Sequence, residues 1–239
     1  MPASRKASEH FQNRRSGVLE QLYILPILLF SVVIHEISHG MMALRLGDST
    51  AKEMGRLTLN PIPHIDPVGS VIVPLFSLLV AGRVFIAWAK PVPINPLNFS
   101  NYRRDDILVA VVGPLSNIAL AFLCSLVVIV LSNVSSFVHA WNNPAADEFM
   151  TFALKMFYGG VYLNIVLAVF NMIPIPPLDG SHVVASFLPA RIGEQYRSIG
   201  FLGIFLILVL MRVESFRLLF SSVINTLSFP FITLIDFFA

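Results

Sequence analysis

The chain has 239 residues, of which 56% are hydrophobic and 13% charged, and its mean hydropathy is +0.76. A soluble domain of this length cannot bury so much apolar surface, so the composition excludes an ordinary soluble protein and indicates a membrane protein with several spans. The formal net charge is only +2, and the basic residues cluster at the ends of apolar runs. That pattern suits control of membrane topology better than nucleic-acid binding, so no nucleic-acid partner is expected.

The first residues of the chain are polar and basic, and residues 1–17 are expected to form a flexible tail. An apolar run from Leu19 to Leu46 then predicts the first membrane span, with Gly47 as its stop. The single cysteine, Cys124, lies within a later span, which excludes a disulfide framework and a cysteine-based metal site.

The motif His35-Glu36-x-x-His39 lies in the second half of the first predicted span. Two histidines four residues apart lie on one face of a helix, close enough to share one cation, and Glu36 beside them could take a proton from a metal-bound water. In a soluble helix this short motif is often a chance match. Each ionisable group at the centre of a bilayer costs roughly 2.5–3.5 kcal/mol, so inside a span a zinc site is the best explanation for it.

Two extended, proline-marked segments follow, Arg56–Asn60 and Lys90–Pro96. They flank an apolar run, residues 68–89, that glycines, a proline and an arginine interrupt. The pattern predicts a short re-entrant or extended β element between the first and second core helices, although a plain span also fits it. The extended segments would offer an edge on which an unwound substrate strand could lie.

The remaining apolar runs predict further spans, so the fold expected is an all-α polytopic membrane protein with about five to six transmembrane helices. These runs are residues 107–131, 149–172, 199–211 and 218–238. The third of them is short for a full span. Three prolines within residues 174–177 break the chain after the second run, and a short helix could resume over residues 181–188.

Zinc held by two histidines needs a third protein ligand, with the fourth position left to water. Asp179 is the better candidate, because it follows the proline break at the end of a span, whereas Glu53 lies in a polar loop. Asp179 could equally be an ordinary N-cap of a helix starting at Gly180, and taken alone the residues leave both possibilities open.

The sequence resembles the site-2 protease family of intramembrane zinc metalloproteases, in its compact bacterial branch. The matching motifs are His35-Glu36-x-x-His39, Gly113-Pro114-x-x-Asn117 and Asn171-x-x-Pro174-x-Pro176-x-Leu178-Asp179-Gly180, in the family's order on successive spans. The resemblance covers roughly residues 20–190. It implies one zinc ion per chain, with His35, His39 and Asp179 as ligands and Glu36 as the catalytic base.

The resemblance also implies that Asn117 and Asn171 line a substrate cleft, and we add Asn95 from the extended segment to this group. A helix–helix hydrogen bond is the alternative role for Asn117. His64 is expected to be a loop histidine, and His182 an interfacial one. No fused PDZ or CBS domain occurs among the 239 residues.

The expected domain organisation is a tail at residues 1–17, a catalytic core at residues 18–190 and accessory transmembrane segments at residues 191–239. The expected substrate is a membrane protein with a transmembrane helix. We expect a multi-pass protein of the bacterial inner membrane with its site toward the cytosol, because the loops on that side carry most of the Lys and Arg that follow the tail. The basic tail opposes this orientation. The rival interpretation is a non-enzymatic metal-binding membrane protein or transporter, which should carry ionisable residues along a path through several spans.

Overall fold

The computed structural model describes residues 23–72, 89–139, 142–200 and 202–239. Within these ranges every regular element is a helix and no strand occurs. The predicted basic tail, residues 1–17, lies outside the described residues, and so do residues 73–88 of the predicted re-entrant run.

In the described part of the chain, four helices are long and apolar enough to cross a membrane: α2 (Ile24–Arg45), α5 (Tyr102–His139), α6 (Pro144–Asn171) and α10 (Glu214–Phe238). A fifth candidate span exists if α8 (Ala190–Arg197) and α9 (Leu202–Leu210), which meet at a bend of 76°, are one broken span. The described residues are therefore all-helical with four to five candidate spans, and the count of five to six stays a prediction. The shorter elements are α3 (Thr50–Glu53), η1 (Ile62–His64), η2 (Pro67–Ile72), η3 (Pro96–Asn98) and α7 (Asp179–Phe187).

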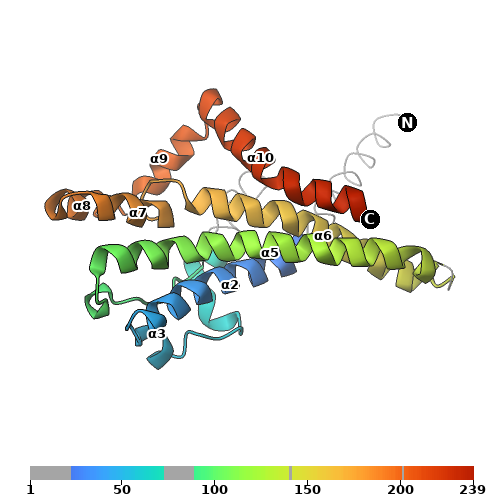
Figure 1. Ribbon diagram of the computed structural model, residues 1–239, viewed down its shortest axis with the longest axis horizontal. Coiled ribbons are helices and arrows are strands. Elements are labelled where there is room, and N and C mark those ends of the chain that lie inside the picture. Colours follow the sequence, from blue (N-terminus) through green and yellow to red (C-terminus); the bar gives the residue numbers. More distant parts are fainter. Residues whose placement is uncertain (1–22, 73–88, 140–141, 201) are drawn as a thin grey trace, which may run out of the picture.

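The long helices α5 and α6 run side by side, with α2 packed against α5 and α10 packed across α6 (Figure 1). Their shared core consists of apolar side chains from all four helices: Ile27, Ala121, Cys124, Val128, Val161, Ile165, Ile224 and Ile235. Gly160 allows the close approach of α6, because a Cβ there would lie only 3.0 Å from Ile27 Cγ1 and 3.1 Å from Cys124 Sγ.

Local sequence sets where these helices begin and end. Gly47 follows α2 with a φ of +106°, a left-handed conformation that glycine adopts without strain. The side chain of Asn143 caps α6 by accepting from the backbone N–H of Ala145, and Pro144 occupies the first helical position. The 38 residues of α5 span about 57 Å at ~1.5 Å per residue, nearly twice a hydrocarbon core of about 30 Å, so α5 extends beyond the membrane.

The predicted short β element is wrong for the described residues. Residues 90–95 have an extended, non-helical backbone, but three of the seven residues from Lys90 to Pro96 are prolines, which lack the N–H that a strand ladder needs. The N–H groups of Val92 and Asn95 are instead taken by the carboxylates of Glu36 and Asp48. The extended, proline-marked segments predicted a β element because the sequence does not reveal these partners.

The two ends of the predicted re-entrant run meet. Lys90 N–H donates to His64 O at 2.9 Å, and Arg56 Nη2 donates to Lys90 O at 2.9 Å. A single crossing between His64 and Lys90 would separate them by about 30 Å. The contact brings the two flanks of the run together, whereas the path of residues 73–88 between them lies outside the described residues.

Candidate metal centre

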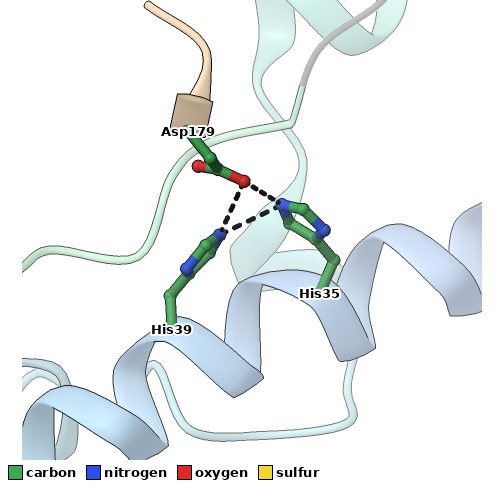
Figure 2. A group of neighbouring side chains, drawn as sticks. All are labelled: His35, His39 and Asp179. Atoms are coloured by element: carbon green, nitrogen blue, oxygen red, sulfur yellow. Dashed lines mark hydrogen bonds and ion pairs between the residues drawn. The ribbon is translucent and has the colours of Figure 1, made fainter. Parts of the chain in front are cut away.

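Two imidazoles on α2 and one carboxylate from α7 converge inside the bundle (Figure 2). His35 Nε2 and His39 Nε2 lie 3.0 Å apart, and Asp179 Oδ2 lies 3.1 Å from the first and 3.3 Å from the second. Both histidines are 7% exposed. The helical spacing of four residues places the two rings on one face, as the sequence predicts.

The break between α6 and α7 brings Asp179 to the histidines. Asp179 is the first residue of α7, and the N-cap position belongs to Leu178, so Asp179 does not serve as the N-cap that the sequence left open. The turn needs a glycine next: a Cβ on Gly180 would lie 2.3 Å from Met172 O at the end of α6. The chain can fold back on α6 only without that atom.

Hydrogen bonds behind the rings fix which nitrogen of each histidine faces Asp179. His35 Nδ1 lies 2.6 Å from Asn117 Oδ1, and His39 Nδ1 lies 2.7 Å from the carbonyl oxygen of Val109. A carbonyl can only accept, so each Nδ1 carries the proton and donates it. In the neutral imidazoles both Nε2 atoms are then lone-pair donors, as metal ligation requires.

The orientation of the Asn117 amide is itself fixed by a chain of hydrogen bonds. Asn164 Nδ2 donates to Gly160 O at 2.9 Å, which leaves Asn164 Oδ1 to accept from Asn117 Nδ2, also at 2.9 Å. Asn117 Oδ1 therefore faces His35. Both asparagines are 0% exposed, so Asn117 lies behind the imidazole and away from any surface.

The three converging atoms fit a zinc ion. Two neutral Nε2 atoms and an ionised carboxylate oxygen have no proton to share, and Asp179 Oδ2 is buried with no hydrogen-bond donor among the described residues. Zinc bonds of about 2.0–2.1 Å in a tetrahedron require ligand atoms roughly 3.3 Å apart. The observed separations of 3.0 to 3.3 Å are close to that value.

Gly113 on α5 leaves room beside the three ligand atoms. A Cβ at this position would lie 2.4 Å from His39 Nε2 and 2.8 Å from His35 Cε1. Separations this short do not occur between real atoms, so any side chain at residue 113 would displace the imidazoles. This gives a physical reason for the glycine of the Gly-Pro-x-x-Asn motif.

Glu36 is half-buried and follows His35 directly on α2. Its Oε2 accepts a hydrogen bond from Val92 N–H at 2.8 Å. This bond holds one carboxylate oxygen, while the other, Oε1, accepts no hydrogen bond from the residues that the structure describes. A carboxylate arranged in this way can accept a proton from a water at the adjacent site.

Two predicted cleft residues form their hydrogen bonds away from the three ligand atoms. Asn171 Nδ2 donates to Leu167 O in its own helix at 3.0 Å. Asn95 caps η3 by accepting from Leu97 N–H at 3.2 Å, and its backbone N–H donates to Asp48. A substrate-binding role for either asparagine stays a prediction.

The two other histidines considered from the sequence do not join the group. His64 is 2% exposed, with Nε2 3.0 Å from Thr58 O. His182 is about half exposed, and its Nδ1 lies 3.2 Å from Asp106 Oδ1. In the described part of the chain, the group that could hold a metal consists of His35, His39 and Asp179.

Sequence reasoning missed Asn164 and Asp48. Asn164 lies two helical turns before Asn171 in the same apolar run, so a polar residue at mid-span was the available signal. Asp48 follows Gly47 at the end of the first span, where an acidic residue is ordinary, yet it is 0% exposed.

Comparison with known proteins identifies a peptidase family. The model of "Peptidase family M50" matches residues 126–211, a range that includes Asn171 and Asp179 but begins after the histidine motif. No solved structure matches the chain.

Three curated relatives are similar to larger parts of the chain than the family model matches. The chain is 36% identical over 199 residues to "Putative zinc metalloprotease YwhC" of Bacillus subtilis, an alignment that covers 82% of this chain and 84% of the relative. It is 28% identical over 156 residues to "Putative zinc metalloprotease Rip2" of Mycolicibacterium smegmatis, covering 64% of this chain and 52% of that protein. A third, "Putative zinc metalloprotease MJ0611" of Methanocaldococcus jannaschii, is 33% identical over 108 residues, covering 44% of this chain and 46% of that protein.

Proposed function

Because this chain belongs to peptidase family M50, the site-2 protease family of zinc metalloproteases, we propose that it cleaves a transmembrane segment of a membrane-anchored substrate. The observation that carries the proposal is the convergence of Asp179 with His35 and His39, which lie with Glu36 on α2, a helix long enough to cross a membrane. A peptide bond hydrolysed at this site would lie at the depth of the spanning helices.

We propose that His35, His39 and Asp179 hold one zinc ion per chain. Zinc bound there supplies a Lewis acid for the scissile carbonyl and for the attacking water. The negative charge of Asp179 offsets part of the cost of burying a dication. Asn117 and Val109 O hold the two imidazoles in the ligating tautomer.

Glu36 is proposed as the general base and acid. It takes a proton from the attacking water and delivers it to the leaving nitrogen. Val92 N–H holds Oε2 at 2.8 Å, which leaves Oε1 for this proton transfer. The roles of His35 and Glu36 are separate, since one binds the metal and the other moves the proton.

A substrate helix hides its backbone carbonyls in hydrogen bonds, so it must unwind locally before its peptide bond reaches the site. The extended segment at residues 90–95 offers few groups for pairing with it. Arg56 occupies the carbonyls of Lys90 and Pro91, and carboxylates occupy the N–H groups of Val92 and Asn95. We therefore assign this segment no strand-pairing role.

The distribution of buried ionisable groups favours an enzyme over a transporter. In the described part of the chain, these groups gather at the end of the bundle where α2 finishes and α5 starts: His35, His39, Asp48, Arg56, His64, Asp105 and Asp106. A transporter should carry them along a continuous path across the membrane.

We propose a bacterial inner membrane location with this end of the bundle toward the cytosol. The loops at this end carry most of the Lys and Arg that follow the N-terminal tail, and cytosolic loops are enriched in both. Asn98 Nδ2 donates to Asp48 at 2.7 Å, so the segments before and after the re-entrant run share one side. Cysteines placed at Ser49 and Ser100 should both be labelled from the cytosol; labelling from opposite sides would contradict the topology.

The experiment that tests the function is cleavage by purified protein in liposomes containing single-span membrane proteins as candidate substrates. Cleavage should occur within the span, stop when a zinc chelator is added and resume when zinc is restored. The matched control is Glu36→Gln, which should bind zinc without cleaving. Cleavage that persists in the chelator, or in Glu36→Gln, would contradict the proposal.

A further inference from the structure

Residues 90–98, which we call the strap, pass over the motif helix beside the proposed base. Val92 lies at the point of contact: it is 5% exposed, and its N–H donates to Glu36 Oε2 at 2.8 Å. The strap packs closely against Gly40, one helical turn after Glu36. A Cβ on this residue would lie only 2.8 Å from Val92 Cγ1. The strap therefore contacts α2 through both backbone and side chain.

Prolines limit how the strap can be held. Pro91, Pro93 and Pro96 have no N–H, so the strap has few backbone donors for a strand ladder. The donors of Lys90, Val92 and Asn95 are each used by groups outside the strap. Its position is therefore set by its partners and not by its own secondary structure.

Two buried charged side chains anchor the strap at its two ends. Arg56, 7% exposed, donates through Nη2 to the carbonyls of Lys90 at 2.9 Å and Pro91 at 3.3 Å. Asp48, 0% exposed, accepts at Oδ2 from Asn95 N–H and at Oδ1 from Asn98 Nδ2, both at 2.7 Å. Val92 lies between the two anchors.

A carboxylate without solvent exposure is costly unless hydrogen bonds compensate for the lost water. Asp48 receives such bonds from the strap and from Thr50 N–H at 3.2 Å. It also stands directly after α2, the helix that carries Glu36. Asp48 thus connects the end of the motif helix to the strap that holds the base.

We propose that Asp48 is a positioning residue for catalysis: by fixing Asn95 and Asn98, it holds Val92 N–H against Glu36 Oε2 and so directs Oε1 toward the metal site. This inference rests on the proposed function of Glu36. Asp48 touches neither substrate nor metal ligands, and it acts through the strap alone.

The first test compares Asp48→Asn with the matched control Glu53→Gln, an exposed carboxylate on the neighbouring helix α3. An Asn side chain has one acceptor oxygen, so it cannot keep both strap bonds. Loss of such outer partners typically costs 10–100-fold, so we expect kcat of Asp48→Asn to fall by roughly tenfold or more. KM and zinc content should hold. A raised KM with unchanged kcat would mean that the strap binds substrate, and loss of zinc would mean a general structural role; either result overturns the proposal.

Asn98→Ala is a milder variant, because it removes one exposed hydrogen-bond partner of Asp48 and keeps the carboxylate itself. It should reduce kcat less than Asp48→Asn, again with zinc retained. The double variant Asp48→Asn/Asn98→Asp restores an amide–carboxylate pair at this position and should recover part of kcat. No recovery, in a protein that is folded and binds zinc, would contradict the proposed connection.

A double-mutant cycle tests the route through Val92. Val92→Pro deletes the N–H in a segment already flanked by prolines, and Val92→Ala is its control. If Asp48 acts through this N–H, adding Asp48→Asn to Val92→Pro should change kcat little further, whereas the effects of independent residues add. Full additivity would overturn the proposal.

Hydrogen exchange tests the strap without any activity. Both neighbours of Val92 are prolines, which have no N–H, so the exchange of the Val92 N–H can be followed separately. Its exchange should be slow in the parent protein and faster in Asp48→Asn and in Glu36→Ala. Unchanged exchange in Asp48→Asn would overturn the proposal. If the parent protein cleaved no substrate but the Val92 N–H still exchanged faster in Asp48→Asn, the proposed function would be wrong while the connection between Asp48 and the strap would stand.

Discussion

His35 Nδ1 lies 2.6 Å from Asn117 Oδ1, so a polar side chain of α5 determines which nitrogen of a histidine on α2 faces the metal site. The bond is fully buried, and the amide of Asn164 fixes its direction from α6. Three helices thus contribute to the tautomer of one imidazole.

Asn117→Ala should weaken zinc binding by about 10–100-fold, because His35 then loses the acceptor that orients it. Zinc affinity measured by competition with a chelator gives the value. Asn133→Ala is the control, since Asn133 lies on the same helix and bonds Ile129 O and Phe238 O, away from the site. Equal zinc affinities in the two variants would contradict the positioning role of Asn117.

Glu36→Gln should abolish cleavage and leave zinc bound, because Glu36 moves a proton and is not one of the three ligands. Loss of a general base typically costs 10²–10⁴-fold in rate. Val92 N–H can still donate to the oxygen of a Gln side chain, so the strap should stay in place. Metal analysis and cleavage assays on the same preparation provide the measurement; a folded variant without metal would make Glu36 a ligand instead.

Much of the site follows from the sequence because its residues are local or sit at recognisable breaks. The histidine pair needs only helical spacing, and the proline break predicted that Asp179 could turn inward. Asn117 was expected to line a cleft or to form a helix–helix hydrogen bond, and its side chain contacts His35 on α2.

The strap and its anchors could not be predicted in the same way. Its hydrogen bonds join groups far apart in sequence, such as Glu36 with Val92 and Arg56 with Lys90. They also join side chains to backbone, so no periodic pattern reports them. The extended, proline-marked segments suggested a β element, although their prolines lack the N–H groups that a strand ladder needs.

Gly113→Ala should disrupt the metal site, because the added Cβ would lie 2.4 Å from His39 Nε2. Overpacking of this kind costs typically 1–3 kcal/mol, and here the imidazole is the group that must move. Zinc occupancy should fall with a smaller loss of thermal stability. Gly159→Ala is the control: its Cβ would meet the terminal Cδ1 of Ile24 at 2.9 Å, a flexible atom that can shift. Full zinc in Gly113→Ala would show that the site tolerates a side chain there.

Asp179→Asn should sharply lower both zinc occupancy and cleavage, since an amide is a neutral and weaker ligand. His64→Ala and His182→Ala should keep the metal, because their ring nitrogens contact Thr58 O and Asp106 rather than the group at His35. Zinc content per chain in the three variants decides the matter. Full zinc in Asp179→Asn, together with loss in either histidine variant, would reassign the third ligand.

The stability that Asp48 contributes should depend on pH. Although burial alone would raise the pKa of its carboxyl, hydrogen bonds from Thr50, Asn95 and Asn98 hold that pKa below the ordinary value of 3.8. A group with a depressed folded-state pKa contributes stability that is fully present above the unfolded pKa and is lost as the pH falls through the folded pKa. The difference in thermal stability between the parent protein and Asp48→Asn should therefore be constant from pH 7 down to about 4 and shrink below it. Thermal unfolding in detergent at several pH values measures the difference, with Glu53→Gln as the control. A difference that grows as the pH falls below 4 would mean that Asp48 is not ionised in the folded protein, and the strap would then lack its charged anchor.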